Sequence, residues 1–442
     1  MNEVSELSSS SPENQREFDL AVFGATGLTG RLVVKQVAAI DALLRSPDGK
    51  RRWAAVGRNR DEVAKVLAEL DLADVDIVVA DLDDAASLQA LAQRTAVVLN
   101  LAGPYTQKAP HLIAACVDAG TSYVDLSGEI PLLRRVIDRF DEPAKRAGVQ
   151  IVQMAGWEAM PADLTTLIAC RRAAGDGAGP DGPGASEPIK DVVVTVTFTR
   201  RPDGGVPFKQ QVSAGTLASI VAMLDDPDAS LVGHADALLP EDASKGAASD
   251  RLHFGDDDAN GRVLGPVPPV AFLNPPIIRR TAALLAAERS APYHPAPYVE
   301  GEDMGDPTLG GALGRKLRAK VKGGLQHLAV AATDLPLPVR EAAAAGLRRI
   351  LPEAGTGPSD SYLEDWAWTV EARATSENAA VGVATIEGTG HPGYTATAAI
   401  IVEVALHMLD RSAAKLRTGC LTPALVIGAS VEGLQVDNLK LR

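Results

Sequence analysis

Short apolar segments alternate with longer amphipathic segments over residues 18–156. The apolar segments read FDLAVFG, RWAAVG, DIVVAD, AVVLNLAG, SYVDLSG and VQIVQMAG, and their length is typical of strands. The segments between them are long enough to form crossover helices. Because the apolar segments are nearly continuous in Val, Ile, Leu and Ala, both faces of their sheet should be covered. The pattern therefore predicts an α/β domain of the Rossmann type, with a doubly wound parallel sheet.

The pattern changes after residue 174. Residues 174–189 are rich in Gly, Pro and Ala and predict a loop or linker. Residues 190–200 alternate like a half-buried strand, and residues 365–390 predict a hairpin of the same sheet, which would be mixed or antiparallel. Residues 395–417 predict a long helix. The expected organisation is a flexible polar tail over 1–17, a Rossmann domain over 18–157, an α+β substrate domain over 158–394 and a C-terminal segment over 395–442.

Composition narrows the functional classes. The 442 residues are 46% hydrophobic, enough for a sizeable core, and the net charge is −14, which argues against nucleic acid as a partner. The three cysteines are far apart, so we expect a reduced, cytoplasmic protein without a metal site. The first 17 residues lack the apolar core of a signal peptide, and no membrane-spanning helix is expected.

Three glycines recur at steps of three in the turn after the first predicted strand, in GATGLTGRLV. Glycine is needed where φ is positive or where backbone approaches a ligand. Between the first strand and first helix of a βαβ unit, this pattern predicts a dinucleotide site with its phosphates on the helix N-terminus. A purely structural tight turn is the alternative. The candidate residues here are Gly24, Thr26, Gly27, Leu28, Thr29 and Gly30.

The end of the second predicted strand indicates which dinucleotide binds. NAD enzymes place an acid there, whereas this strand ends in Gly57, Arg58 and Asn59. The planar donor fork of arginine suits a phosphate, so NADPH is predicted, with Arg58 as the anchor and Arg60 as a second possibility. Asn59 is predicted to bind the cofactor as well. Later strand ends should face the same crevice. They add Asp81 near the adenine, and Asn100, Ala102 and Gly103 beside the phosphates and the nicotinamide ribose.

The motifs GATGLTGRLV, GRN, NLAGPY, CVDAGTSYVDLSGE and GWEAMPADL together resemble the saccharopine dehydrogenase-like oxidoreductases, and most closely the mycobacterial trans-acting enoyl reductases. The resemblance is strongest over 18–165 and least clear over 225–310. It implies NADPH-dependent reduction, a second α+β domain, and a C-terminal segment that returns to the first domain. It also implies a lipid-like substrate, the double bond of a polyketide-derived acyl chain, delivered by a carrier or by a synthase that lacks its own reductase.

Enoyl reduction requires a hydride, a donor for the developing enolate oxygen and a proton for the α-carbon. The sequence lacks the Tyr-x-x-x-Lys pair of short-chain dehydrogenases. Tyr105 is a candidate donor to the carbonyl, and Tyr123 and Asp125 are candidates for a catalytic or proton-relay role, as is Glu129. Each has a structural alternative, such as packing or helix capping.

Two further candidates lie outside these strand ends. Trp157 either walls the nicotinamide pocket or belongs to the core. His391 lies between glycines in GTGHPGY, where it is either an acid facing the site or a loop residue without a catalytic role.

Residues 309–328 carry five cations without an acid, and their leucines and valine fall near one helical face. Such a helix could lie on an anionic membrane, giving peripheral attachment at the inner face of the plasma membrane, or dock an acidic carrier. Alternatively, it packs its leucines on the core. For the whole chain, a saccharopine-type reductase of C=N or C=O bonds and a non-enzymatic NADP-binding sensor or scaffold in lipid synthesis remain alternatives to an enoyl reductase.

Overall fold

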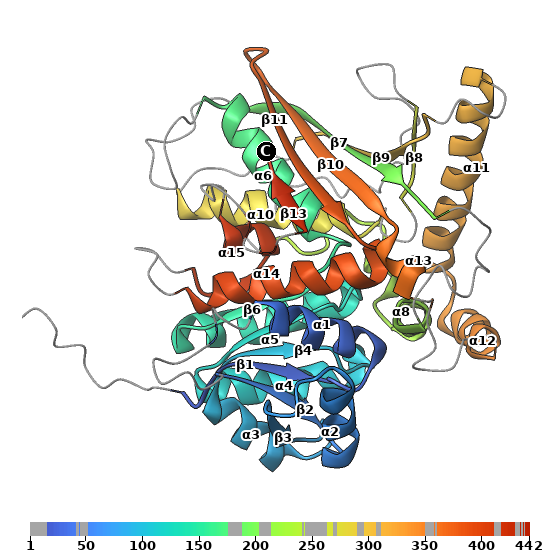
Figure 1. The fold of residues 1–442 in the computed structure, drawn as a ribbon. Helices are drawn as coiled ribbons and strands as arrows, with labels where there is room; N and C mark the ends of the chain where they lie inside the picture. Colours follow the sequence, from blue (N-terminus) through green and yellow to red (C-terminus); the bar gives the residue numbers. More distant parts are fainter. Residues whose placement is uncertain are drawn as a thin grey trace, which may run out of the picture.

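The computed structural model contains two sheets joined by helices (Figure 1). The part of the chain that it describes comprises residues 16–40, 44, 52–175, 188–202, 214–240, 243, 263–267, 272–289, 296–305, 311–349, 358, 360–410, 417–428, 434, 436 and 438–442. The first 15 residues of the expected tail and most of the expected linker therefore lie outside the described residues.

The first sheet has seven strands in the order β12-β6-β5-β4-β1-β2-β3, and all of its pairings are parallel. Its strands are β1 (Phe18–Phe23), β2 (Trp53–Gly57), β3 (Asp76–Val79), β4 (Thr95–Asn100), β5 (Ser122–Asp125), β6 (Gln150–Val152) and β12 (Gly419–Leu421). The order reverses between β1 and β4, which creates a crevice at their carboxyl ends. The predicted Rossmann-type parallel sheet is confirmed.

Helices connect these strands because their apolar residues recur on one face. In α1, for example, Val33, Val34 and Val37 are buried. The connecting helices are α1 (Leu28–Ala39), α2 (Arg60–Glu69), α3 (Ala85–Arg94), α4 (Tyr105–Ala119) and α5 (Ile130–Ala147), and α6 (Met160–Ala173) leads from β6 to the second sheet. Of these, α3, α4 and α5 pack against one another in sequence, and α1 packs against a helix from the C-terminal part of the chain.

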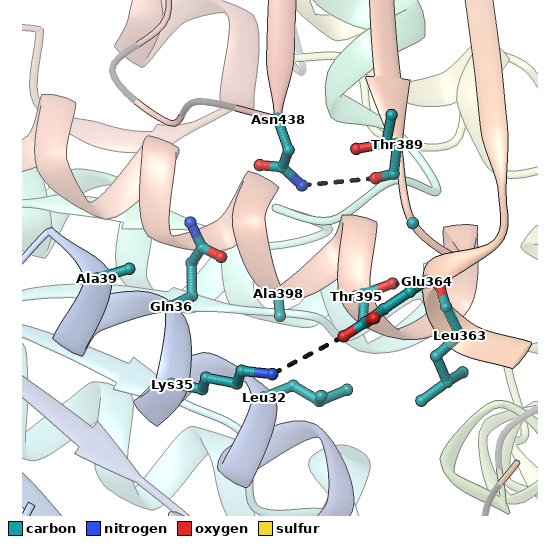
Figure 2. Close-up of a pocket in the computed structure, with 11 residues that line it drawn as sticks. Leu32, Lys35, Gln36, Ala39, Leu363, Glu364, Thr389, Thr395, Ala398 and Asn438 are labelled. Atoms are coloured by element: carbon teal, nitrogen blue, oxygen red, sulfur yellow. Dashed lines mark hydrogen bonds and ion pairs between the residues drawn. The ribbon is translucent and has the colours of Figure 1, made fainter. Parts of the chain in front are cut away.

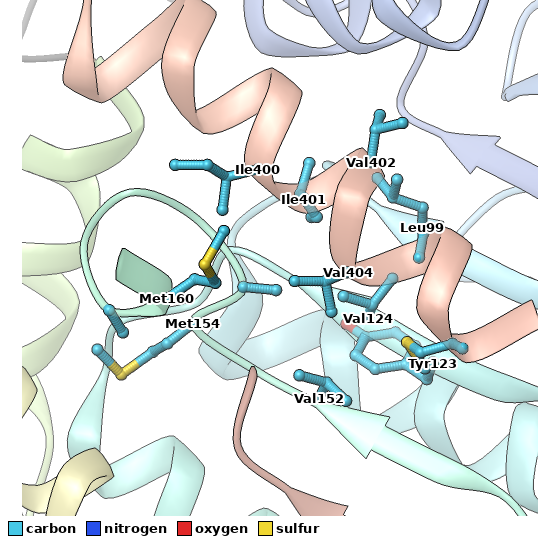
Figure 3. Packing of buried hydrophobic residues seen from close by; sticks show 14 of the residues in the cluster. Leu99, Tyr123, Val124, Val152, Met154, Met160, Ile400, Ile401, Val402 and Val404 are labelled. Carbon is cyan, nitrogen blue, oxygen red and sulfur yellow. The ribbon is translucent and has the colours of Figure 1, made fainter. Parts of the chain in front are cut away.

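That helix, α14 (Thr397–Leu409), is apolar on nearly every side and lies between the two sheets (Figure 1). Figure 3 shows Ile401 and Val404 among side chains of the first sheet, including Leu99 and Val124. The window Pro392–Leu409 is apolar and long enough to cross a membrane, but 78% of it is buried inside the protein. Such burial is typical of a core helix. It ends at Leu409, earlier than the predicted 395–417, and follows the π-helical turn η3 (Pro392–Ala396).

The second sheet is mixed, with the order β13-β11-β10-β7-β9-β8. Its strands are β7 (Ile189–Arg200), β8 (Leu264–Gly265), β9 (Tyr298–Asp303), β10 (Ala367–Ser376), β11 (Val381–Thr389) and β13 (Leu439–Leu441). The predicted hairpin is the antiparallel pair β10–β11, and α6 packs on this sheet. The remaining elements are α8 (Ala214–Asp225), η2 (Ala229–Leu231), α10 (Asn274–Glu288), α11 (Gly311–Ala332), α12 (Leu337–Arg348), α13 (Asp360–Glu364) and α15 (Pro423–Ile427).

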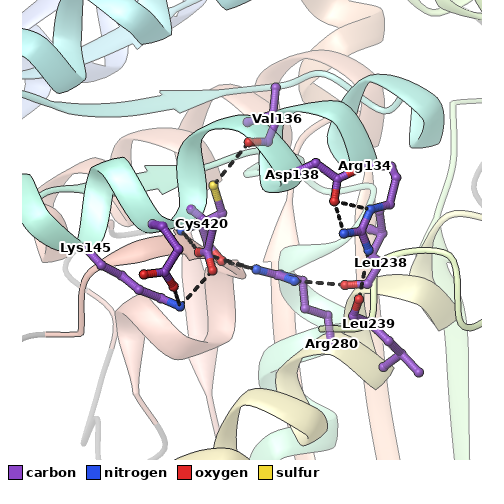
Figure 4. A network of polar contacts seen from close by, with 10 residues as sticks. Arg134, Val136, Asp138, Lys145, Leu238, Leu239, Arg280 and Cys420 are labelled. Carbon is purple, nitrogen blue, oxygen red and sulfur yellow. Dashed lines mark hydrogen bonds and ion pairs between the residues drawn. The ribbon is translucent and has the colours of Figure 1, made fainter. Parts of the chain in front are cut away.

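A polar network joins β12 to α5 and α10 (Figure 4). The buried Arg280 guanidinium donates to the carbonyl oxygens of Cys420, at 2.7 Å, and Leu238, at 2.9 Å. Asp141 accepts from the backbone N–H of Cys420 at 2.7 Å and pairs with Lys145 at 2.8 Å. These contacts hold the C-terminal strand β12 at the edge of the first sheet, while β13 from the same segment pairs with β11 in the second.

Candidate active site

The glycine-rich turn between β1 and α1 forms a tight cradle. Gly24 has a φ of +89°, and a Cβ there would lie 3.0 Å from the backbone nitrogen of Ala102. A Cβ on Gly30 would lie 2.0 Å from the carbonyl oxygen of Gly24, so only glycine fits. Gly27 caps α1 without a side-chain hydrogen bond. The first N–H groups of α1, from Leu28 to Gly30, therefore remain available for a phosphate, as dinucleotide binding requires.

The carboxyl end of β2 lies beside this cradle, because the backbone N–H of Gly24 donates to the carbonyl of Val56 at 2.9 Å. Arg58 follows β2 with an exposed side chain. Asn59 caps α2 and accepts from the N–H groups of two residues in its first turn, at 3.0 and 3.3 Å. Arg60 donates to the carbonyl of Ile77 at 3.1 Å. Arg58 is thus the better placed of the two arginines for a 2′-phosphate.

The next strand ends supply positioning groups. The Asp81 carboxylate accepts from the N–H of Asp83 at 3.0 Å and shapes the turn after β3. Asn100, at the end of β4, is fully buried, and its Oδ1 accepts from the N–H of Ala102 at 3.0 Å. This bond fixes the loop that carries Gly103 over the crevice. Both amide groups of Asn100 have protein partners, so its side chain positions the loop.

A buried hydrogen-bond chain links the ends of β4, β5 and β6. Asn100 donates to the Tyr123 hydroxyl at 2.9 Å, and Tyr123 donates to Asp125 at 2.7 Å. Asp125 also accepts from Ser127, through its hydroxyl at 2.7 Å and its N–H at 3.0 Å, and Gln153 donates to that hydroxyl at 2.9 Å. Burial raises the pKa of Asp125 to about 6, although its hydrogen bonds oppose the shift. Tyr123 and Asp125 are both fully buried.

Three ionisable side chains near this hydrogen-bond chain have raised pKa values. Burial raises the pKa of Tyr105, at the start of α4, well above its usual value, and the charges of Asp125, Glu129 and Glu158 raise it further. Burial raises the pKa of both Glu129 and Glu158 to about 7. Glu129 accepts from the Ser219 hydroxyl at 2.5 Å through Oε1, whereas its buried Oε2 has no hydrogen-bond partner. At neutral pH, Tyr105 is therefore protonated, and Glu129 and Glu158 are each protonated in a substantial fraction of molecules.

The pKa values of Glu129 and Glu158 are shifted by burial and neighbouring carboxylates, and no nearby cation contributes to these shifts in the described part of the chain. Glu158 was not predicted from the sequence, although it lies within the GWEAMPADL motif. Its burial depends on packing between distant segments, which local periodicity does not reveal. Ser219 was missed for the same reason, because it reaches Glu129 from α8.

The remaining two candidates belong to an aromatic cluster between the sheets. The Trp157 ring contacts Phe198 and Trp368, with ring centroids 6.0 and 5.8 Å apart, and its buried Nε1 has no partner. The His391 ring lies against the Trp366 ring, with ring centroids 4.7 Å apart. Its Nδ1 accepts from the N–H of Gly393 at 3.0 Å, and burial lowers its pKa to about 4. His391 is therefore neutral at physiological pH and caps the η3 turn.

A cavity of about 270 Å³ lies between α1 and the segments that follow it in space, α13, the end of β11 and α14 (Figure 2). Leu32, Lys35 and Gln36 line it from α1, and Leu363 and Glu364 line it from α13. No predicted cofactor or catalytic residue lines it. The arrangement of the strand ends, and not this cavity, therefore locates the candidate active site.

Comparison with known proteins identifies the family. A protein of Mycobacterium tuberculosis, whose name gives trans-acting enoyl reductase as a provisional assignment, is 31% identical, over 97% of this chain and 97% of its own length. The chain belongs to the saccharopine dehydrogenase-like oxidoreductase family. The model of the saccharopine dehydrogenase NADP binding domain matches residues 20–152. A trans-acting enoyl reductase of Mycobacterium ulcerans is 29% identical over 94% of both chains.

Among solved structures, saccharopine dehydrogenase (L-Glu forming) of Saccharomyces cerevisiae covers 92% of this family member and 94% of its own chain, at 12% identity and a TM-score of 0.44. The family assignment makes the chain an NADPH-dependent oxidoreductase. The cradle fits this cofactor, because the uncapped N-terminus of α1 offers N–H groups and Gly30 leaves no room for a side chain. We expect Arg58 to bind the 2′-phosphate.

Proposed function

We propose that this protein is a trans-acting enoyl reductase, which uses NADPH to reduce a carbon–carbon double bond in a polyketide-derived acyl or lipid intermediate. One observation carries the proposal. At the carboxyl ends of the strands beside the cradle, the pKa of Tyr105 is raised well above its usual value and those of Glu129 and Glu158 are raised to about 7, and no cation contributes to the shifts of the two glutamates in the described residues. A proton-rich, cation-poor edge suits addition to a neutral enoyl group better than binding of an amino-acid carboxylate. The names of the relatives support the same reaction class.

In this proposal, each of the side chains has a separate role. NADPH, when bound, supplies the hydride that adds to the β-carbon. Tyr105 donates a hydrogen bond to the carbonyl oxygen as negative charge develops there. Its high pKa keeps the phenol protonated throughout the physiological range. Tyr123 and Asp125 are buried and hydrogen-bonded to each other, and with Asn100 they hold the ends of β4 and β5 together.

The α-carbon then requires a proton. Glu129 and Glu158 have pKa values of about 7, so each carries a proton in a substantial fraction of molecules at neutral pH. Glu158 is the more accessible, since its side chain is only half-buried, whereas Glu129 is 2% exposed. We therefore assign proton donation to Glu158 and proton storage to Glu129.

Turnover with purified protein tests the proposal. NADPH oxidation is measured with a long-chain trans-2-enoyl thioester and, separately, with an amino acid plus a keto acid. We expect turnover with the thioester, and Tyr105→Phe should lower its kcat roughly 10- to 100-fold while leaving NADPH affinity unchanged. Turnover only with the amino-acid pair would replace this proposal with a saccharopine-type activity. Tight NADPH binding without turnover on either would favour a sensor or scaffold.

A further inference from the structure

Helix α11 (Gly311–Ala332) turns its apolar face away from the protein. It packs inward through small residues, because Ala319 is buried against Val263 and Met304, and Gly323 is also buried. Val330, near the end of the helix, is also buried. The other large apolar residues of α11 whose burial the structure describes point outward. Leu317, Val321, Leu325 and Leu328 are between 57% and 68% exposed. The expectation that this helix packs its leucines on the core is therefore wrong. The helical spacing of the apolar residues predicted an amphipathic helix but did not reveal which of its faces is buried.

The exposed apolar surface is concentrated at this place. Nine large apolar side chains are exposed in the described part of the chain, and seven of them lie between residues 317 and 339. These seven, which we call the α11 patch, are Leu317, Val321, Leu325, Leu328, Leu335, Leu337 and Val339. In Figure 1, α11 and α12 lie at the edge of the molecule, with α11 beside β8 at the edge of the second sheet. On α11 the four exposed residues are three or four positions apart and therefore share one helical face, and an exposed apolar stripe of this kind marks an interaction surface.

Cations flank the α11 patch. Residues 311–332 contain Arg315, Lys316, Arg318, Lys320 and Lys322 and no acid, in a chain whose net charge is −14. At 100° per residue, Lys316 and Lys320 lie along one edge of the leucine face, and Arg318 and Lys322 lie along the other. Lys322 pairs with Glu302 at 3.1 Å, so part of its charge anchors the helix. Lys316 and Lys320 have exposed side chains.

From this arrangement we infer that the α11 patch binds the surface of an anionic lipid bilayer. Leucine and valine side chains enter the acyl boundary, while flanking lysines extend their charged ends to the phosphate headgroups. A strongly acidic protein is otherwise repelled by such a surface, so the local cations supply the attraction that the chain as a whole lacks. The surface thus places the reductase where lipid intermediates are found.

Two other occupants fit less well. Face-to-face pairing of two copies would bring the cationic edges together, and like charges oppose such an interface. A specific protein partner usually meets aromatic anchors, whereas the α11 patch contains only Leu and Val. A fluid bilayer needs apolar area and charge without shape complementarity, which matches the residues present.

Sedimentation of the full-length protein with vesicles tests the inference. Vesicles of phosphatidylglycerol and phosphatidylcholine in equal parts are compared with vesicles of phosphatidylcholine alone. Wild-type protein should bind the anionic vesicles at least about tenfold more strongly. Leu317→Ser with Leu325→Ser, and separately Lys316→Glu with Lys320→Glu, should each lower binding to anionic vesicles roughly 10- to 100-fold. Val381→Ser is the matched control, since Val381, at the start of β11 in the second sheet, is 44% exposed outside the patch and should not matter.

NADPH affinity, unchanged in all variants, verifies that each one is folded, because α11 contributes nothing to the cradle. The inference is overturned if wild-type protein ignores anionic vesicles, or if Leu317→Ser with Leu325→Ser binds them as wild type does. Analytical ultracentrifugation without lipid covers the remaining case. A dimer that this double variant abolishes would assign the α11 patch to a second copy and also overturn the inference.

Discussion

Replacing Glu129 with Gln should change how stability depends on pH. The Glu129 pKa is raised from 4.5 to about 7, chiefly by burial and secondarily by the charges of Asp125 and Asp226, while the bond from Ser219 opposes the shift. A carboxyl group whose pKa is higher in the folded state binds its proton more tightly there. Its favourable contribution is therefore complete below pH 4.5 and is lost as the pH rises through 7. Glutamine keeps the shape and an acceptor for Ser219, but it does not titrate.

The magnitude follows from the shift of 7 − 4.5, or 2.5 pH units. At 1.36 kcal/mol per unit, the free energy of unfolding of wild type minus that of Glu129→Gln should fall by about 3 kcal/mol between pH 4.5 and pH 8. Urea unfolding followed by circular dichroism at a series of pH values measures this difference. Glu341→Gln, which makes the same change at an exposed position on α12, is the control.

A difference that is flat with pH, or that grows as the pH rises, would refute this reasoning. Glu129 would then be ionised in the folded protein at neutral pH. In that case it could not store a proton for the reaction, and the division of roles between Glu129 and Glu158 would have to be abandoned.

Three further outcomes follow from the structure. Arg58→Asp should lower kcat/KM for NADPH roughly 10- to 100-fold and raise it for NADH, because a cation that pairs with the 2′-phosphate is replaced by an anion that repels it. Steady-state kinetics with both cofactors measures this change, and an unaltered cofactor preference would contradict the assignment. Gly30→Ala should prevent stable folding, because its Cβ would lie 2.0 Å from the Gly24 carbonyl oxygen. In Gly27→Ala the Cβ would lie 3.5 Å from the same atom, so this variant should fold but bind NADPH more weakly. Thermal unfolding and NADPH titration distinguish the two variants, and equal melting temperatures would contradict the expectation. Asp163→Ala should cost about 2 kcal/mol, because the buried backbone N–H of Ala424, which donates to Asp163 at 3.0 Å, would be left without a partner and the Thr281 hydroxyl, at 2.6 Å, would lose one of its contacts. Urea unfolding measures the loss, and wild-type stability would disprove the role.

The first sheet was predictable because each of its strands is a short apolar run bounded by turn residues, and periodicity reports such local order directly. The strand order in β-sheets of this type then places Gly24, Arg58 and Asn100 at one edge, whatever the details of packing. Asn59 was predicted to contact the cofactor. In the structure its side chain caps α2, a role that fits a capping pattern, because Glu62 follows it by three residues.

Features that depend on contacts between distant segments were not predictable. The burial of Glu158 and the approach of Ser219 to Glu129 arise from packing between separate parts of the chain. The outward face of α11 was equally hidden, because a helical repeat gives the width of an apolar stripe but not its direction. In α11, small residues such as Ala319 make the inward contact, so the usual rule that large apolar residues are buried fails there.

The transfer of deuterium from the cofactor to the acyl chain tests enoyl reduction most directly. The protein is incubated with NADPH carrying deuterium at nicotinamide C4 and with a trans-2-enoyl thioester, and the product is analysed by mass spectrometry. The account predicts a saturated thioester with deuterium at the β-carbon, and in heavy water with unlabelled NADPH, deuterium at the α-carbon instead. An unreduced thioester, alongside deuterium transfer to the product of an amino acid and a keto acid, would contradict it.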